Sequence, residues 1–342
     1  MSSLKIFLNP TERNEATSYY VDLLRKGFEC QFSDISEVSQ VSDLKKDDIV
    51  LVITLYAFNL IRKYNKKQSI IYWFQGISPE ELKMFNSNNS IRQILRRKYW
   101  SYIERKVLKK AKMLFFVSHA MQEHLKKKYG YNKENFLVIP CFNVELNNQA
   151  FDIQDKYKKP SFVYAGGILP WQCIEQTIRL FIELKKQIPE ASLTILTKDI
   201  ETAKSLAQKN GLNDLTVKHI PYQKLSEELQ KYKYGMLLRE DVIVNQVATP
   251  TKFNSYLALG IIPVFSNVIA DFKQHINELH TKVEVDSLTE FSKTIRQIQD
   301  LESIEINPKD VEKEYRAVFE EYYNPTRYVS MICKKASEIF PK

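Results

Sequence analysis

The chain has 342 residues, which is more than one hydrophobic core usually supports and predicts about two domains. A hydrophobic fraction of 44% and a charged fraction of 27% are ordinary for a globular protein and argue against long disordered stretches. The formal net charge of +9 favours an anionic partner, such as nucleic acid, anionic lipid or a phosphorylated ligand.

The four cysteines are widely spaced and form no CxxC pair. Their spacing therefore suggests neither a zinc site nor a disulfide framework, and it fits a reducing cytoplasm. The apolar patch within the first nine residues is too short for a signal peptide. No run approaches the roughly 18 apolar residues of a membrane-spanning helix. We expect a cytoplasmic protein whose contact with the inner face of the cell membrane would be peripheral.

Continuous apolar runs alternate with helical patterns along the first half of the chain. Runs that do not alternate in polarity, with helices between them, predict a parallel sheet covered on both faces. Helical spacing covers residues 16–26, and Ser118 is a good N-cap for a helix over 119–128. The strands predicted here are residues 4–8, 49–55, 69–74, 113–117 and 136–139.

A polar and charged segment, residues 149–160, is typical of a linker, and the same alternation starts again after it. Strands are predicted at residues 161–165, 192–197, 215–220, 234–238 and 261–265. Helices are predicted at residues 173–187, 200–210, 225–231 and 250–259, followed by a helical tail over 308–340 that is broken at Asn324-Pro325.

The two series of strands and helices predict an α/β protein with two doubly wound, Rossmann-like domains that face a cleft. The first domain would span residues 1–150 and the second residues 160–320. Residues 321–342 would form a C-terminal helix that could cross back to the first domain. Ligands of such sheets bind beyond the carboxyl ends of the strands.

Two helix starts in the second domain could bind phosphate, because free backbone N–H groups and the helix dipole attract anions. One follows Gly166-Gly167, where a ligand could approach the backbone, although a plain strand–helix turn explains these glycines equally well. The other has Thr249 before Pro250 and Lys252 in its first turn. A cation there opposes the dipole, and a bound diphosphate would offset the repulsion; a lysine that points into solvent is the alternative.

The polar loop before Pro250, with Arg239 upstream at a strand end, favours the phosphate site. Here the chain resembles, over about residues 4–340, a GT-B glycosyltransferase of the large retaining family 4 type. The segments that carry the resemblance are Leu114-Phe115-Phe116-Val117-Ser118, Val138-Ile139-Pro140, Tyr164-Ala165-Gly166-Gly167 with Trp171-Gln172, Gly235-Met236-Leu237-Leu238-Arg239, 245–252, and Tyr256-Leu257-Ala258-Leu259-Gly260.

The resemblance implies an enzyme that transfers a sugar, with retention, from a nucleotide-diphosphate sugar to a glycan or lipid-linked acceptor. The setting would be bacterial surface polysaccharide, such as capsule or O-antigen. The first domain would then lie on the acceptor side and the second would bind the nucleotide sugar, with no metal or other cofactor. By the same resemblance Arg239 and Lys252 hold the donor diphosphate. The residues around the donor would be Gly166, Gly167, Asn245, Thr249, Pro250, Thr251 and Ser255.

The chain departs from the family pattern at two places. Many members have a Glu-x7-Glu pair whose second Glu binds the donor ribose, and these positions are Val247 and Ser255 here. Many also have an Arg after the first glycine and a Lys nearby, where this chain has Gly167 and Trp171-Gln172. The alternative is therefore a catalytically inactive GT-B protein that acts as a binding or partner subunit.

A loop in the first domain carries two neighbouring carboxylates, Glu80 and Glu81, just after a predicted strand. Carboxylates at a strand end could orient acceptor hydroxyls or take a proton, and Gln75 could bind a hydroxyl where related enzymes often have His. The alternative is helix capping, with Ser78 as N-cap and Pro79 at the first helical position. Both can hold together, so Gln75 and Glu80 are the candidate catalytic residues of this domain.

Residues 92–112 contain nine basic side chains, opposed only by Glu104, with Tyr99, Trp100 and Tyr102 among them. A basic helix with aromatic residues suits an anionic membrane surface, each basic residue near it contributing on the order of 1 kcal/mol. A solvated helix face is the commoner fate of such a run, and nucleic acid is a third interpretation. Because the aromatic residues fit a helix rather than a stacking platform, we expect no nucleic-acid partner.

Overall fold

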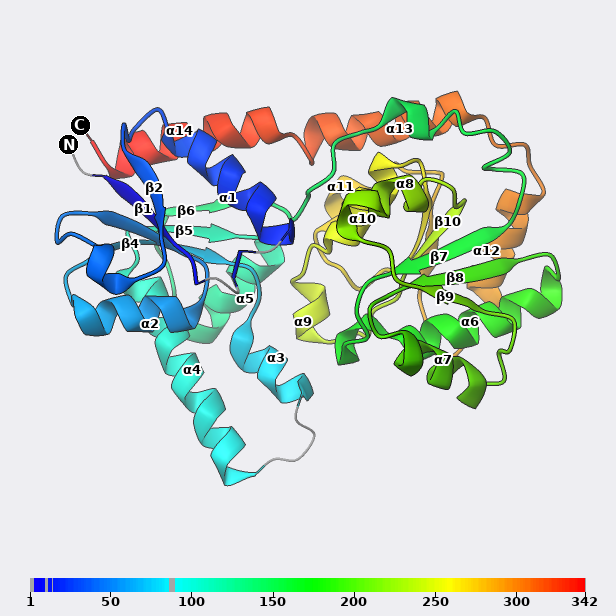
Figure 1. The fold of residues 1–342 in the computed structure, drawn as a ribbon, viewed down its shortest axis with the longest axis horizontal. Coiled ribbons are helices and arrows are strands. Elements are labelled where there is room, and N and C mark those ends of the chain that lie inside the picture. Colours follow the sequence, from blue (N-terminus) through cyan, green and yellow to red (C-terminus); the bar gives the residue numbers. More distant parts are fainter. Residues whose placement is uncertain (1–2, 10–11, 14, 86–89, 342) are drawn as a thin grey trace. The chain divides into compact units, whose positions relative to one another are not determined.

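A computed structural model of the chain describes residues 3–9, 12–13, 15–85 and 90–341 and divides into two compact units (Figure 1). Unit 1 comprises Met1–Cys141 and Asn324–Lys342, and unit 2 comprises Phe142–Tyr323. The polar segment 149–160 belongs to unit 2, where Phe151, Lys156 and Tyr157 are buried. The chain thus passes from unit 1 to unit 2 and returns to unit 1 for its last helix.

Unit 1 is built on a six-stranded parallel sheet in the order β2-β1-β3-β4-β5-β6. The central strands are buried along their whole length, as expected of apolar runs covered on both faces. The predicted parallel sheet is therefore confirmed, with one edge strand that the apolar pattern missed, Ile35–Val38. The strands are β1 (Leu4–Phe7), β2 (Ile35–Val38), β3 (Ile49–Val52), β4 (Ser69–Phe74), β5 (Met113–Phe116) and β6 (Phe136–Val138).

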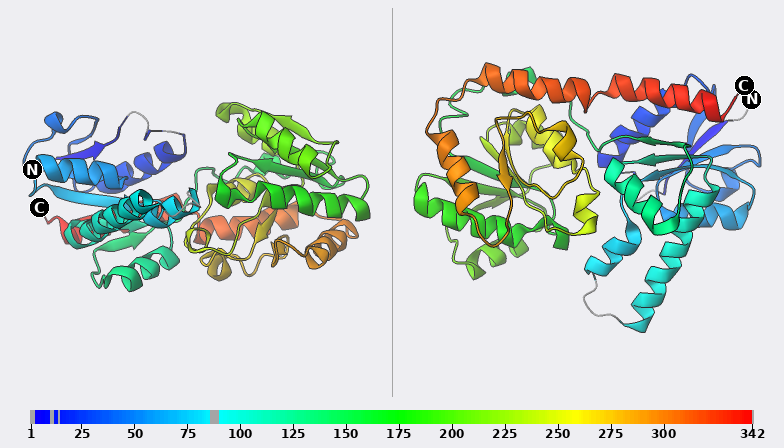
Figure 2. Two further views of the ribbon diagram at one scale, coloured as in Figure 1. Left: turned by 90° about the horizontal axis from the view of Figure 1, so that it is seen from below. Right: turned by 180° about the vertical axis from the view of Figure 1, so that it is seen from behind.

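Helices cover both faces of this sheet (Figures 1 and 2). α1 and α14 pack side by side, so closely that a Cβ atom on Gly27 would lie 2.6 Å from the side chain of Ile332. Thr54 caps α2 and Ser118 caps α5 through their side-chain oxygens, as the sequence predicts for Ser118. The helices are α1 (Glu15–Phe28), α2 (Leu55–Tyr64), α3 (Ser78–Phe85), α4 (Ile91–Lys110), α5 (His119–Tyr129) and α14 (Pro325–Ile339), with a short 3-10 turn η1 (Val41–Asp43).

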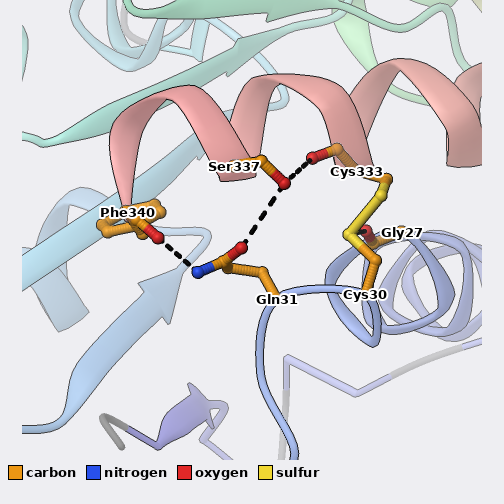
Figure 3. The surroundings of a disulfide bond; sticks show 6 residues. All are labelled: Gly27, Cys30, Gln31, Cys333, Ser337 and Phe340. Atoms are coloured by element: carbon orange, nitrogen blue, oxygen red, sulfur yellow. Dashed lines mark hydrogen bonds between the residues drawn. A yellow bond between two sulfur atoms is a disulfide. The ribbon is translucent and has the colours of Figure 1, made fainter. Parts of the chain in front are cut away.

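A disulfide joins Cys30, just beyond α1, to Cys333 of α14 (Figure 3). The Gln31 side chain donates a hydrogen bond to the carbonyl of Phe340 and accepts one from Ser337 Oγ at 3.4 Å. The expectation that the cysteines form no disulfide framework is wrong for this pair. The fold brings together residues 303 positions apart, a separation that leaves no local signature in the sequence.

Unit 2 is built on a second six-stranded parallel sheet, in the order β12-β11-β10-β7-β8-β9. Each unit, taken by itself, is a doubly wound, Rossmann-like domain, so the two predicted domains of this class are confirmed. The strands are β7 (Ser161–Ala165), β8 (Ser192–Leu196), β9 (Thr216–Lys218), β10 (Tyr234–Leu237), β11 (Ile262–Ser266) and β12 (Val283–Val285).

The helices of unit 2 flank this sheet (Figure 1). They are α6 (Ile174–Gln187), α7 (Ile200–Lys209), α8 (Leu225–Leu229), α9 (Ile243–Gln246), α10 (Thr251–Ala258), α11 (Phe272–His275), α12 (Ser292–Glu302) and α13 (Pro308–Glu321), with 3-10 turns η2 (Asn148–Ala150), η3 (Pro170–Gln172) and η4 (Tyr222–Lys224). Across the described ranges of both units, no helix combines the length and the apolar character needed to cross a membrane.

Candidate functional site

The sheet of unit 2 reverses its strand order between β7 and β10, which pair directly although β8 and β9 lie between them in the chain. Gly166 follows β7 immediately, and Arg239 lies two residues beyond the end of β10. Doubly wound sheets bind their ligands at such a reversal, beyond the carboxyl ends of the strands. Topology alone therefore places these two predicted residues where a ligand is expected.

Lys252, in the first turn of α10, turns its side chain toward Gly166 rather than into open solvent. Its ammonium donates a hydrogen bond to Gln172 Oε1 at 2.8 Å and lies 4.2 Å from the centre of the Tyr164 ring. A Cβ atom on Gly166 would lie 2.5 Å from Lys252 Nζ, and Gly166 has a φ of +142°. The missing side chain and the positive φ of Gly166 thus make room for the lysine.

Arg239 is the second cation at this point and is 5% exposed. Its backbone N–H donates to Ser266 Oγ at 2.8 Å, and its guanidinium donates to the carbonyl of Leu238 at 2.8 Å. Both contacts are to neutral oxygen atoms. The sheet therefore holds a buried guanidinium that no carboxylate neutralises within the described residues.

The two cations lie close enough to repel each other. Burial, and then the charge of Arg239, lower the pKa of the Lys252 ammonium well below its usual value, and burial lowers the pKa of Arg239. Neither forms an ion pair with a carboxylate in the part of the chain that the structure describes. A buried guanidinium and a half-buried ammonium without a counterion cost folding free energy unless an anion joins them, so this arrangement suits a dianionic or diphosphate ligand.

The start of α10 adds backbone N–H groups to the two cations. The helix begins at Thr251 with Pro250 as its N-cap, one residue later than predicted, and Thr249 before it is 3% exposed. Asn245 holds the preceding turn by donating from Nδ2 to the carbonyl of Glu240 at 3.0 Å. The first amides of a helix have no acceptor within the helix and attract anions, although Lys252 itself opposes the dipole.

The two positions that depart from the family pattern have short side chains in the structure. Val247 is 2% exposed, and Ser255 Oγ donates to the carbonyl of Thr251 at 3.1 Å. The hydroxyl of Ser255 is thus bonded to its own helix, one turn back. Gly167, the other predicted glycine, is less crowded than Gly166, because a Cβ atom there would have Asp199 Oδ2 at 3.9 Å as its nearest neighbour.

Sequence reasoning missed the side chains that support the two cations. Gln172 Oε1 accepts from both Lys252 and the Tyr164 hydroxyl, and Ser266 anchors the backbone of Arg239.

Asn254, which is fully buried in α10, binds the backbone N–H groups of Asn143 and Val144 at 3.0 Å each. An asparagine among the apolar residues of a predicted helix was the one available signal for this last contact.

In unit 1 the candidate residues follow β4. Gln75 is exposed directly beyond the strand, and Glu80 lies in the first turn of α3. Glu80 Oε1 pairs with Lys128 Nζ at 2.7 Å and with His124 Nε2 at 3.1 Å. Burial acts against ionisation, but these two partners prevail and lower the pKa of the Glu80 carboxyl. Glu80 is therefore a carboxylate that is already ion-paired within its own unit.

Glu81, rather than Ser78, caps the start of α3. Its Oε1 accepts a hydrogen bond from the backbone N–H of Ile77 at 3.1 Å, while Ser78 lies within the helix. The capping alternative is thus correct in kind, but the capping residue differs because the helix begins one residue earlier than expected. Burial raises the pKa of the Glu81 carboxyl.

A further polar contact lies where the sheet of unit 1 reverses its order, between β1 and β3. Glu12, in the loop after β1, accepts from Thr54 Oγ1 at 2.7 Å and from the backbone N–H of Asn9 at 2.9 Å. Sequence reasoning missed Glu12 because no motif surrounds it. Among the described residues of both units, no group of three or more His, Cys, Asp or Glu side chains could hold a metal ion.

Comparison with known proteins shows similarity at the level of the fold. No family model matches the chain, and no curated protein matches its sequence. Sucrose-phosphate synthase from Thermosynechococcus elongatus superposes with a TM-score of 0.69 at 11% identity, covering 99% of each chain. A UDP-forming α,α-trehalose-phosphate synthase from Burkholderia xenovorans gives a TM-score of 0.63 at 11% identity, covering 94% of this chain and 80% of the other.

A mutant of S. aureus TarM, in complex with Fondaparinux, alpha-GlcNAc-glycerol and UDP, gives a TM-score of 0.63 at 12% identity. The match covers 94% of this chain and 59% of TarM, so this chain spans about three fifths of that protein. At these identities the similarity concerns the fold.

Proposed function

We propose that this protein is a glycosyltransferase that moves a sugar from a nucleotide-diphosphate sugar to a glycan or lipid-linked acceptor. The observation that carries the proposal is the pair of cations, Arg239 and Lys252, at the strand-order reversal of unit 2. They lie close enough for the charge of Arg239 to lower the pKa of Lys252, beside the start of α10, and neither is ion-paired with a carboxylate among the described residues. Solved structures with the same fold support this assignment, because one is a trehalose-phosphate synthase named as UDP-forming and another, TarM, was solved in complex with UDP.

The chemistry that follows is loss of a nucleoside diphosphate. The bond between the anomeric carbon and the diphosphate oxygen breaks, and the leaving group departs with the electron pair. Arg239, Lys252 and the first amides of α10 would stabilise the negative charge that develops on it. The acceptor hydroxyl then bonds to the anomeric carbon and passes its proton to the departing diphosphate oxygen. Retention of configuration and a role in surface polysaccharide synthesis are parts of the proposal that follow from the family resemblance.

On the acceptor side we assign Gln75 and Glu80 to contacts with acceptor hydroxyls. Gln75 is exposed beyond β4, and an amide can donate and accept hydrogen bonds with a sugar. Glu80 is ion-paired with Lys128, so a role in orienting hydroxyls suits it better than proton abstraction. Glu12 at the strand-order reversal of unit 1 is a further candidate for the same role.

The test of the donor site is calorimetric titration of UDP and GDP into the full chain and into Lys252→Ala. Loss of one charge-assisted contact to phosphate should weaken binding by about ten- to a hundredfold. Lys204→Ala, on the exposed surface of α7, is the matched control and should bind as the parent does. Equal affinity of Lys252→Ala and the parent for both nucleotides would refute the diphosphate assignment.

One observation favours a second candidate, a GT-B protein that binds nucleotide without catalysis and acts as a partner subunit. Where a ribose-binding Glu is common in the resembled family, Ser255 bonds to its own helix. A panel of nucleotide sugars separates the two candidates: release of free sugar or transfer to an acceptor supports the enzyme. Nucleotide binding without turnover of any donor supports the partner subunit.

A membrane setting is the final part of the proposed function. Lipid-linked acceptors reside in membranes, and α4 carries eight basic residues against one acidic residue. An anionic inner leaflet would attract such a helix. We therefore propose peripheral association with an anionic membrane and no nucleic-acid partner.

A further inference from the structure

We propose that α4 docks unit 1 on an anionic lipid bilayer by inserting a stripe of apolar side chains into the headgroup region. The α4 stripe consists of Ile91, Leu95, Tyr99 and Tyr102. The inference deepens the proposed function, on which it rests for the reason why a transferase would need a membrane. It goes further by naming the inserting side chains, and by requiring that apolar insertion as well as charge sustains the binding.

The stripe lies on one exposed face of the helix, and the Tyr99 hydroxyl at its edge accepts a hydrogen bond from Asn59 Nδ2 of α2 at 2.8 Å. Steps of four, four and three residues place the four side chains along one line of an α-helix. Their exposed fractions are 78%, 61%, 44% and 59%. The buried side chains of α4 lie on the other side of the helix and are Ile103, Glu104, Val107 and Leu108. A helix that is apolar on its outer face as well as its inner face has an unsatisfied surface.

Basic side chains border the stripe on both sides. Lys98 and Arg105 are exposed on one side of it, and Arg92 and Arg96 are exposed on the other. Lys106 Nζ lies 5.5 Å from the centre of the Tyr102 ring. Glu104 does not offset this charge, because it is buried and bonded to Lys128 Nζ at 2.9 Å. Long basic side chains beside apolar ones can reach lipid phosphates while the apolar groups enter the interface.

The position of the helix in unit 1 leaves the stripe accessible. The N-terminal half of α4 and the neighbouring α3 extend away from the sheet of the unit (Figure 1). Phe85, the last residue of α3, is 52% exposed and adds an aromatic ring at the same end of the helix pair. The other exposed large apolar side chains among the described residues are Tyr56 and Tyr64 of α2, and Leu169, Tyr222 and Ile304 of unit 2.

The composition of the stripe favours lipid over the other anionic partners. A nucleic acid would use the arginines, lysines and aromatic rings, but it offers nothing to the aliphatic side chains of Ile91 and Leu95. A protein interface usually excludes lysine from its apolar core, whereas here Lys98 and Lys106 border the apolar residues directly. An interfacial helix combines both features.

The test is sedimentation of the full chain with vesicles of phosphatidylcholine containing phosphatidylglycerol, and with vesicles of pure phosphatidylcholine. We expect the parent to bind the anionic vesicles. The double variant Ile91→Ser/Leu95→Ser should bind them about tenfold or more weakly, since each substitution removes an inserted aliphatic group. Ile304→Ser is the matched control, because Ile304 is 58% exposed and belongs to unit 2 rather than to the stripe. Circular dichroism and thermal melts verify that each variant is folded.

Each result decides the question. Equal vesicle binding by the double variant and the parent overturns the inserted stripe, as does no binding by the parent. A dimer in solution that the double variant abolishes, without vesicle binding, identifies a second copy as the occupant and also overturns the proposal. If the parent and the double variant both bind tRNA and neither binds vesicles, the partner is a nucleic acid, and the proposal is likewise overturned. Because Lys252→Ala should bind vesicles normally, failure of the donor site and failure of the stripe are distinguishable.

Discussion

Gly166→Ala tests whether the turn after β7 exists to accommodate Lys252. Adding a Cβ atom would place it 2.5 Å from Lys252 Nζ, 2.6 Å from its Cε and 3.3 Å from Gln172 Oε1. The backbone cannot relax easily, because the N–H of Gly166 donates to the carbonyl of Leu196 at 2.9 Å. The flexible end of Lys252 must therefore move away, and the ammonium leaves the position from which it would contact a phosphate.

The magnitudes follow from two separate effects. The φ of +142° is unfavourable for alanine and should cost about 1–3 kcal/mol of folding free energy. At roughly 2–4 °C per kcal/mol for a unit of this size, the melting temperature should fall by about 2–12 °C. Displacing the ammonium should weaken the binding of UDP or pyrophosphate by about tenfold, somewhat less than deleting the lysine does.

Gly167→Ala is the matched control. Its φ is not positive, and the nearest atom to an added Cβ would be 3.9 Å away, so both stability and affinity should stay within about 0.5 kcal/mol of the parent. The assays are calorimetric titration and thermal melts of both variants, alone and combined with Lys252→Ala. In the Lys252→Ala background, Gly166→Ala should have no further effect on affinity. Additive losses, or equal losses from the two glycine variants, would refute the reasoning.

Three further predictions concern the covalent and polar contacts of the fold. Reduction of the disulfide between Cys30 and Cys333, or Cys333→Ser, should destabilise unit 1 by about 4–5 kcal/mol, because the bond closes a long loop. Calorimetry with and without reductant measures the loss of stability, and an unchanged unfolding transition would contradict the prediction. Burial lowers the pKa of Lys156 to about 7, whereas a lysine in the unfolded chain has a pKa of about 10.4. Between these two pH values the unfolded chain binds more protons than the folded one, so stability should rise with pH across this window. Thermal melts at pH 7, 8 and 9 should show this rise, and Lys156→Met should flatten it. Asn254→Ala should lower the free energy of unfolding, measured with denaturant, by about 2–4 kcal/mol, because the N–H and the carbonyl of Val144 both lose their hydrogen bonds to the Asn254 side chain. A loss below about 1 kcal/mol would show that water replaces these hydrogen bonds.

The sheets were predictable because a parallel strand covered on both faces consists of consecutive apolar residues in the sequence. The ends of the elements were not, and β3 shows why. The apolar run extends over residues 49–55, but the strand ends at Val52, and α2 begins at Leu55 behind the Thr54 cap. Apolar residues at a helix start resemble those of a strand when periodicity is the only guide. The short edge strands β2 and β12 lack a long run and were missed.

The candidate site divides in the same way. Helix-start chemistry pointed to Lys252 and a strand end pointed to Arg239, since both depend on local sequence. The partners of these cations depend on tertiary structure: Gln172 comes from the turn after β7, and Ser266 ends β11. No spacing rule joins residues 172 and 252, or 239 and 266, before the strand order is known. The disulfide of unit 1 was unpredictable for the same reason.

Replacing Lys252 of the cation pair tests whether this lysine serves ligand binding or the stability of the fold. Burial and the neighbouring Arg239 lower the pKa of Lys252, so its charged form opposes folding at neutral pH and the opposition fades as pH rises toward 10.4. Lys252→Met keeps the apolar stem without the charge and should stabilise the ligand-free chain by about 1–2 kcal/mol at pH 7. The same variant should lose affinity for UDP. Stability gained together with binding lost is the mark of a group retained for function, whereas stability lost in the absence of ligand would mean that Lys252 serves the fold through Gln172 and Tyr164.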